Sequence, residues 1–177
     1  MISSNDFDHF LRKGYIKGLP AGTSVKKLIT VYGKKYWGVK ERDTNGLIYG
    51  IIKVGFIEFH IYDEKISGIS YRPDIIYSKK DFNAVLVPWI EKKRSLQAVE
   101  AALTNRKIQF KRFTITGPLD SLTTAGGDFF YVEPGEYTLI DTEGGVTWVF
   151  EKNESTGQLE ARQICKYYRR TNEINSQ

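Results

Sequence analysis

Residues 47–71 constrain the fold more than any other part of this chain, and they read LIYGIIKVGFIEFHIYDEKISGISY. The segment contains three apolar runs of strand length, separated by Gly55 and by the turn-like residues 63–65. Within residues 56–62, aliphatic and aromatic side chains alternate with polar ones, which is typical of a strand that buries one face. Short turns between three such strands predict an antiparallel meander.

Two short helices and one strand are predicted before this meander. Polar capping residues and a following glycine predict a helix over residues 4–13, capped within residues 4–6, and a second helix over residues 25–32. Residues 36–41 are predicted to form the first strand. The Asn-Gly pair within residues 43–46 predicts the hairpin turn that leads into the meander.

The second half of the chain has the same order of elements. Residues 95–105 form the clearest predicted helix, with a serine cap, strong helix formers and an asparagine at the end. Residues 75–93 are open to two interpretations, an additional helix or an extended linker. The strands predicted in this half are residues 108–115, 129–132, 137–141, 146–152 and 159–168.

The order of elements suggests an internal duplication. A shift of 71 residues sets Val25 beside Leu96, and the apolar faces of the two predicted helices then agree. Further along, residues 55–61 resemble residues 145–150, each segment starting from a glycine. Internal repeats are sought before individual elements are assigned, because a missed repeat leads to a wrong assignment of the whole fold.

The predicted fold is therefore α+β, with two tandem units, each consisting of short helices packed on one face of an antiparallel β-meander. The first unit spans residues 1–74 and the second spans residues 94–170. Residues 75–93 form the linker or extra helix between them, and residues 171–177 are a polar, flexible tail. The two sheets could also join into one longer, curved sheet.

The first unit resembles a known pattern. The pattern begins with the run LPAGTSVKKL and continues to the glycine at position 33. Three short segments follow, at residues 48–50 (IYG), 59–61 (FHI) and 66–69 (ISGI). The pattern resembles the β-lactamase inhibitory protein, itself a tandem repeat, and the small lipoprotein of the outer-membrane barrel assembly machinery. It covers residues 16–72. Similar modules occur in bacterial immunity-type proteins, so the resemblance implies a helix-plus-meander module that neutralises a toxin.

The chain departs from these families at two points. Lys34 and Lys35 stand where a proline is expected, and the lipidated cysteine of the lipoprotein is absent. The second departure counts against a role in the bacterial envelope.

Composition favours a packed domain in a reducing compartment. Hydrophobic residues make up 41% of the 177 residues and aromatic residues 14%, which is enough for a core. A single cysteine, Cys165, excludes an intrachain disulfide. Without an apolar leader or an apolar run of membrane length, the sequence predicts a cytoplasmic protein with no membrane partner. The net charge of +5 permits an acidic protein or nucleic acid as the partner.

No group of residues in the sequence predicts catalysis, a metal or a cofactor. The only histidines, His9 and His60, lie in a predicted helix and a predicted strand, and no spacing brings them together for acid–base chemistry. Cys165 lacks a neighbouring base that would activate it, and no cluster of metal ligands accompanies it. We therefore expect a protein that is not an enzyme.

The candidate site is the sheet face that the helices leave open. On residues 56–62, the aliphatic and aromatic side chains face the core, so the polar ones face the other way. Exposed aromatic residues amid mixed charges are the anchors that protein interfaces use. Tyr49 and Lys53 join this face, subject to a strand register that the sequence leaves open by one residue. The expected partner-binding residues are Tyr49, Lys53, Glu58, His60, Tyr62 and Trp37.

Two classes of partner follow from these residues. The first is another protein, a toxin or enzyme domain with an acidic surface, which the chain would occlude as a bacterial immunity or inhibitor protein. The alternative is nucleic acid, because basic and aromatic residues are interleaved in the second half. Those residues are Lys107, Phe110, Lys111, Arg112, Tyr167, Tyr168, Arg169 and Arg170.

Overall fold

The computed structural model of the chain describes residues 3–33, 37–42, 44–54, 57–71, 94–117 and 135–167. The predicted linker or helix at residues 75–93, the strand at 129–132 and the tail at 171–177 lie outside these residues.

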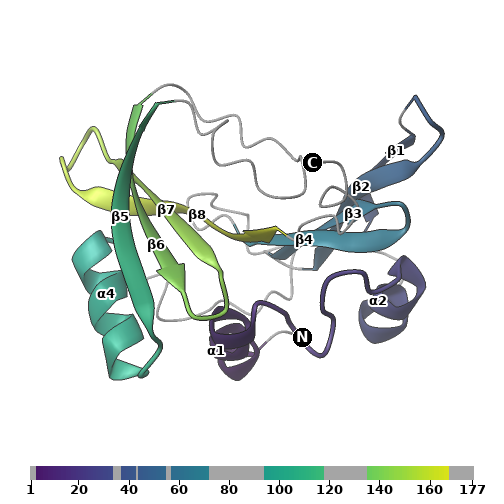
Figure 1. Cartoon of the computed structure of the whole chain (residues 1–177), viewed down its shortest axis with the longest axis horizontal. Helices are drawn as coiled ribbons and strands as arrows, with labels where there is room; N and C mark the ends of the chain where they lie inside the picture. Colours follow the sequence, from purple (N-terminus) through teal and green to yellow (C-terminus); the bar gives the residue numbers. More distant parts are fainter. Residues whose placement is uncertain are drawn as a thin grey trace, which may run out of the picture.

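The described strands form one antiparallel sheet of eight strands in the order β1-β2-β3-β4-β8-β7-β6-β5 (Figure 1). The first four strands form one meander and the last four form another. The two meanders join where β4 pairs with β8. The α+β class and the antiparallel meanders are confirmed, and the meanders share a single sheet. The strands are β1 (Trp37–Arg42), β2 (Ile48–Val54), β3 (Ile57–Tyr62), β4 (Lys65–Tyr71), β5 (Phe110–Gly117), β6 (Gly135–Thr142), β7 (Thr147–Lys152) and β8 (Leu159–Tyr167).

Three described helices, α1 (Ser4–Lys13), α2 (Val25–Tyr32) and α4 (Leu96–Asn105), lie on one side of this sheet, as Figure 1 shows. Each begins after a serine whose hydroxyl accepts a backbone N–H of the first turn. The cap of α1 is Ser3, just before the predicted residues 4–6, and its partner in a reciprocal capping box is Asp6. The predicted helix spans are otherwise confirmed. In the described part of the chain, no helix has the length and apolarity needed to cross a membrane.

The core lies between the three helices and the sheet. The ring of Tyr32 on α2 lies 5.8 Å from that of Phe59 on β3. The ring of Phe7 on α1 lies 6.0 Å from Tyr71 of β4 and 6.4 Å from Trp148 of β7. Because Tyr71 and Trp148 belong to different meanders, α1 packs across the line where the two meanders meet.

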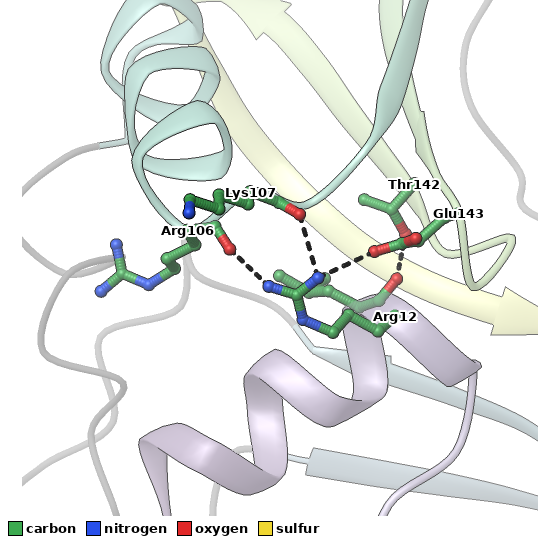
Figure 2. A network of polar contacts seen from close by, with 6 residues as sticks. Arg12, Arg106, Lys107, Thr142 and Glu143 are labelled. Carbon is green, nitrogen blue, oxygen red and sulfur yellow. Dashed lines mark hydrogen bonds and ion pairs between the residues drawn. The ribbon is translucent and has the colours of Figure 1, made fainter.

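The end of α1 is fixed to the second half of the chain (Figure 2). The carbonyl of Leu11 accepts hydrogen bonds from the Thr142 hydroxyl at 2.6 Å and from the Gly144 N–H at 3.0 Å. Arg12 donates to the carbonyls of Arg106 and Lys107, which follow the last turn of α4, and to the carboxylate of Glu143. One arginine therefore supplies donors to the carbonyl end of a second helix, where backbone acceptors lack intrahelical partners.

A β-bulge in β4 decides which residues face the core. His60 pairs with Gly68, but the next residue of β3, Ile61, pairs with Ile66, so one residue of β4 has no opposite partner. The extra residue reverses the alternation of the strand. Ile66 and Ile69 are consequently both buried in the core, and Ser70 falls on the opposite face of the sheet.

Candidate functional site

The two faces of β3 differ as the sequence predicts. Ile57, Phe59 and Ile61 belong to the core and Phe59 is fully buried, whereas Glu58, His60 and Tyr62 alternate with them and are half-buried. The core assignment is therefore confirmed. The three polar side chains lie on the face that no described helix covers.

The strand register places Tyr49 and Lys53 on the same face. Tyr49 pairs with Tyr62 and Lys53 pairs with Glu58, and directly opposite residues of antiparallel strands point to one side. Tyr49 is one of the large hydrophobic side chains that remain exposed, at 37%. The register that the sequence leaves open is thus fixed, and we call Tyr49, Lys53, Glu58, His60 and Tyr62 the β2–β3 face.

Trp37 is the one predicted site residue that is not placed on this face. It is the first residue of β1, and its backbone lies opposite Ile52 of β2, next to a register irregularity. Its side chain lies outside the described part of the structure.

The β2–β3 face holds a continuous row of polar contacts across three strands. The ammonium of Lys53 lies 2.7 Å from Oε1 of Glu58. The hydroxyl of Ser70 on β4 donates to Oε2 of Glu58 at 3.4 Å, and Nε2 of His60 lies 2.9 Å from the same hydroxyl oxygen. The single hydroxyl of Ser70 thus contacts both the carboxylate of Glu58 and the imidazole of His60.

Ser70 is a functional candidate that the sequence does not single out. In a perfectly alternating strand it would share the face of Ile66 and point into the core. The bulge moves it to the polar face, and a bulge has no clear sequence signal here. Sequence reasoning therefore assigns Glu58 and His60 to the site but misses the residue that connects them.

The row orders side chains but is not arranged for nucleophilic catalysis. A catalytic serine needs a histidine between its hydroxyl and the carboxylate, whereas here the hydroxyl lies between His60 and Glu58. Ser70 is also only 1% exposed, so a substrate could not reach its oxygen. The contacts instead hold two long side chains and an imidazole in fixed positions.

Cys165 lies next to this row, directly opposite Ser70 on β8. Its thiol is buried and donates a weak hydrogen bond to the carbonyl of Thr147 at 3.6 Å. Burial raises the pKa of the Cys165 thiol, and the negative charge of Asp141 raises it further. The thiol is thus held in its protonated, unreactive form.

The same side of the sheet is apolar in the second half of the chain. Tyr137 and Leu139 of β6 and Val149 of β7 form a small buried cluster, against which Phe113 and Ile115 of β5 pack. Leu139 is fully buried. Tyr137, Leu139 and Val149 are thus buried on this side, whereas Phe113 and Ile115 are partly buried and Lys111 of β5 is exposed.

The structure separates the two histidines. His9 belongs to α1, on the helical side of the sheet, and its ring lies 4.9 Å from that of Tyr15. His60 lies on the opposite side of the sheet, in contact with Ser70. Within the described residues, no group of three or more histidine, cysteine or acidic side chains could hold a metal ion.

The basic and aromatic residues of the nucleic-acid interpretation do not form one described surface. Lys111 and Arg112 lie on β5, at one edge of the described sheet, whereas Tyr167 ends β8 at the middle of the sheet. Strands β6 and β7 lie between them. Tyr168, Arg169 and Arg170 fall outside the described residues.

We compared the chain with profiles of known protein families, with curated proteins and with solved structures, and none of them matches it.

Proposed function

We propose that this chain is a non-enzymatic protein-binding module, a bacterial immunity or inhibitor protein of the cytoplasm that occludes a toxin or enzyme through its β2–β3 face. The observation that carries the proposal is the combination of Tyr49 and Tyr62 with a pre-ordered row of charged side chains. Tyrosine supplies large contact area with few rotatable bonds, which suits it as an anchor. The resemblance of residues 16–72 to inhibitory modules points the same way.

The order within the row supports a steric mechanism of binding. Lys53 and Glu58 are already paired at 2.7 Å and Ser70 holds the second carboxylate oxygen, so little side-chain freedom remains to be lost on association. The Tyr49 hydroxyl also donates to Glu41 on the neighbouring strand. Charged groups around aromatic anchors set orientation and association rate, and the positive net charge of the chain favours an acidic target.

We propose further that the chain consists of two copies of one helix-plus-meander unit. Ser24 caps α2 and its backbone bridges to Lys65, the first residue of β4. Ser95 caps α4 and its backbone bridges to Glu160, near the start of β8. The helix of each half is thus attached to the last strand of that half in the same way.

The irregularities of the two meanders correspond as well. The bulge between β3 and β4 falls between His60 and Ile61, and the one between β7 and β8 falls between Val149 and Phe150. Matching the bulges sets Phe59 beside Trp148. The alignment of residues 55–61 with 145–150, which starts from the two glycines, is shifted by one residue relative to this correspondence. The shift arises because counting from a glycine takes no account of the strand register.

The bulge correspondence predicts how the two halves superpose. Superposing residues 57–61 on 146–150 should bring residues 65–71 onto 160–166, with Ser70 on Cys165. Halves that superpose only with another offset would contradict a duplication with this register.

A binding measurement with the candidate target tests the proposed function. If a toxin-domain gene lies beside the gene of this chain, its product is the target, and isothermal titration calorimetry gives the affinity. Tyr62→Ala should weaken binding by about 2 kcal/mol or more, as truncation of an aromatic anchor does. Lys26→Ala, on the exposed surface of α2, is the control and should leave affinity unchanged.

Two outcomes would reject the proposed function. Equal affinity of the Tyr62→Ala variant and the unchanged protein would remove the β2–β3 face as the binding surface. Steep salt-dependent binding to DNA or RNA, without affinity for a neighbouring gene product, would favour the nucleic-acid alternative instead.

A further inference from the structure

The turn between β1 and β2 contains Asn45 followed by Gly46, which is the only Asn-Gly pair in the sequence. Thr44, Asn45 and Gly46 are all exposed to solvent. A Cβ atom added at Gly46 would meet no other atom within 4 Å. The backbone that follows the Asn45 side chain is therefore uncrowded.

An asparagine side chain can react with the backbone nitrogen of the next residue, which makes asparagine one of the thermally labile residues. The nitrogen attacks Cγ of the carboxamide, a five-membered succinimide ring closes, and ammonia leaves. Water then opens one of the two ring carbonyls and yields either aspartate or isoaspartate. A side chain on the next residue hinders ring closure, and glycine has none. The Asn45-Gly46 pair thus lacks the main steric barrier to this reaction.

Asn153, in the turn between β7 and β8, is held in a way that opposes the reaction. Its amide nitrogen donates to the carboxylate of Glu160 at 3.0 Å. Its side-chain oxygen accepts the backbone N–H of Ser155 at 2.9 Å and that of Thr156 at 3.2 Å. The residue that follows it, Glu154, also carries a side chain. Asn153 is therefore an internal reference for a protected asparagine.

Asn105, the last residue of α4, shows that exposure is not sufficient. It is exposed, as Asn45 is, but the residue that follows it is Arg106. The backbone N–H of Arg106 donates to the carbonyl of Ala102 at 3.2 Å, which continues the helical hydrogen bonding. The nitrogen that would attack Asn105 is thus hindered by a side chain and engaged in a hydrogen bond.

We propose that Asn45 is a site of spontaneous modification, at which the native chain converts through a succinimide to aspartate and isoaspartate. The bond between Cγ of Asn45 and its amide nitrogen breaks as Cγ bonds to the Gly46 nitrogen, and the proton of that nitrogen leaves with the ammonia. Opening of the ring consumes one water molecule and restores an N–H. The reaction requires no reagent other than water.

The isoaspartyl product changes the hairpin as well as its charge. It adds one carbon atom to the main chain between Asn45 and Gly46, and the register of a hairpin is set by the length of its turn. Arg42 of β1 pairs with Ile48 of β2, and its guanidinium donates to the carbonyl of Gly46 at 2.8 Å. These contacts are next to the added atom, so we expect the isoaspartyl form to loosen β1 from β2.

Mass spectrometry after warm incubation of the full chain at pH 8 tests the site. Conversion of the amide to an acid should add about 1 Da to the tryptic peptide of residues 43–53. The rate at Asn45 should exceed the rates at Asn105 and Asn153 about tenfold or more. Asn45→Gln would need a six-membered ring to react, so it is the matched control and its peptide should keep its mass. A native chain that reacts no faster at Asn45 than at Asn153 would overturn the proposal.

Hydrogen exchange tests the effect on the hairpin separately. The isoaspartyl form, isolated by chromatography, should exchange the amides of β1 faster than the unchanged chain does. Asn45→Asp carries the same charge on an ordinary backbone and should exchange them as the unchanged chain does. Equal exchange in the isoaspartyl form and in Asn45→Asp would contradict the loosening of β1.

Discussion

Ser70 of β4 lies directly opposite Cys165 of β8, at the point where the two meanders join. Both side chains are buried on the side of the sheet away from the helices. The pairs on either side, Ile69 with Lys166 and Tyr71 with Ile164, point to the helical side. Two small polar side chains thus occupy the middle of the sheet and connect the row of the β2–β3 face to the second half of the chain.

The hydroxyl of Ser70 should contribute measurably to stability. Ser70→Ala removes the group between His60 and Glu58, and we expect a loss of about 1–2 kcal/mol in the free energy of unfolding, since the half-buried His60 and Glu58 each lose one hydrogen bond. Ser67→Ala on the same strand is the matched control, because the buried Ser67 hydroxyl has no hydrogen-bond partner in the structure. Urea unfolding measures the free energy of unfolding of both variants. A loss at Ser67 as large as that at Ser70 would contradict this account of the row.

The thiol of Cys165 should be protected in the native protein. Its burial, and a pKa raised by that burial and by Asp141, leave almost no thiolate for reaction. We expect labelling by a disulfide reagent at pH 8 to be slow and to accelerate with urea in parallel with unfolding. Rapid labelling of the native chain would mean that the centre of the sheet opens readily.

Gly144 should tolerate no side chain. A Cβ atom at this position would lie 2.7 Å from both the Gly14 nitrogen and the Leu11 oxygen, so the end of α1 would have to move. Gly144→Ala should destabilise the fold by about 2–3 kcal/mol, as overpacking does. Gly157→Ala is the comparison, because a Cβ there has open space and only its φ of 70° is unfavourable, which costs about 1 kcal/mol. Thermal unfolding of the two variants should rank them in this order.

The capping box of α1 should make stability depend on acid pH. Burial favours a higher pKa for the Asp6 carboxyl. Hydrogen bonds from Ser3 and the charge of Lys17 outweigh this effect, so the pKa of Asp6 lies below its ordinary value. A lowered pKa in the folded state stabilises the fold above the pKa of the unfolded chain, and this contribution disappears as pH falls through the folded value.

Asp6→Asn should therefore be less stable than the unchanged chain at pH 7 and differ little from it at pH 2. Urea unfolding at both pH values measures the two differences. Asp63→Asn, in the exposed turn before β4, serves as the control for removing one carboxylate. A deficit for Asp6→Asn that persists unchanged at pH 2 would show that the charge of Asp6 does not carry the effect.

Local rules explain how much of the fold could be predicted. Ser24 and Gly33 delimit α2 at the predicted residues, because caps and glycine ends act over a few residues of backbone. The alternation around Phe59 identifies the buried side of β3 correctly, since side-chain direction in a strand has a period of two. These features depend on neighbours in sequence, and the sequence contains them in full.

The candidate site depended on contacts between distant parts of the chain. Ser70 reaches Glu58 and His60 only because one extra residue in β4 reverses the alternation. The pairing of β4 with β8 brings it next to Cys165, which lies far along the chain. Arg12 likewise contacts the end of α4 and Glu143 across long sequence separations. Register, bulges and strand order follow from the packing of all elements together. The sequence by itself therefore determined the helices and the buried side of β3, and only the tertiary structure decided the buried side of β4 and which polar groups meet.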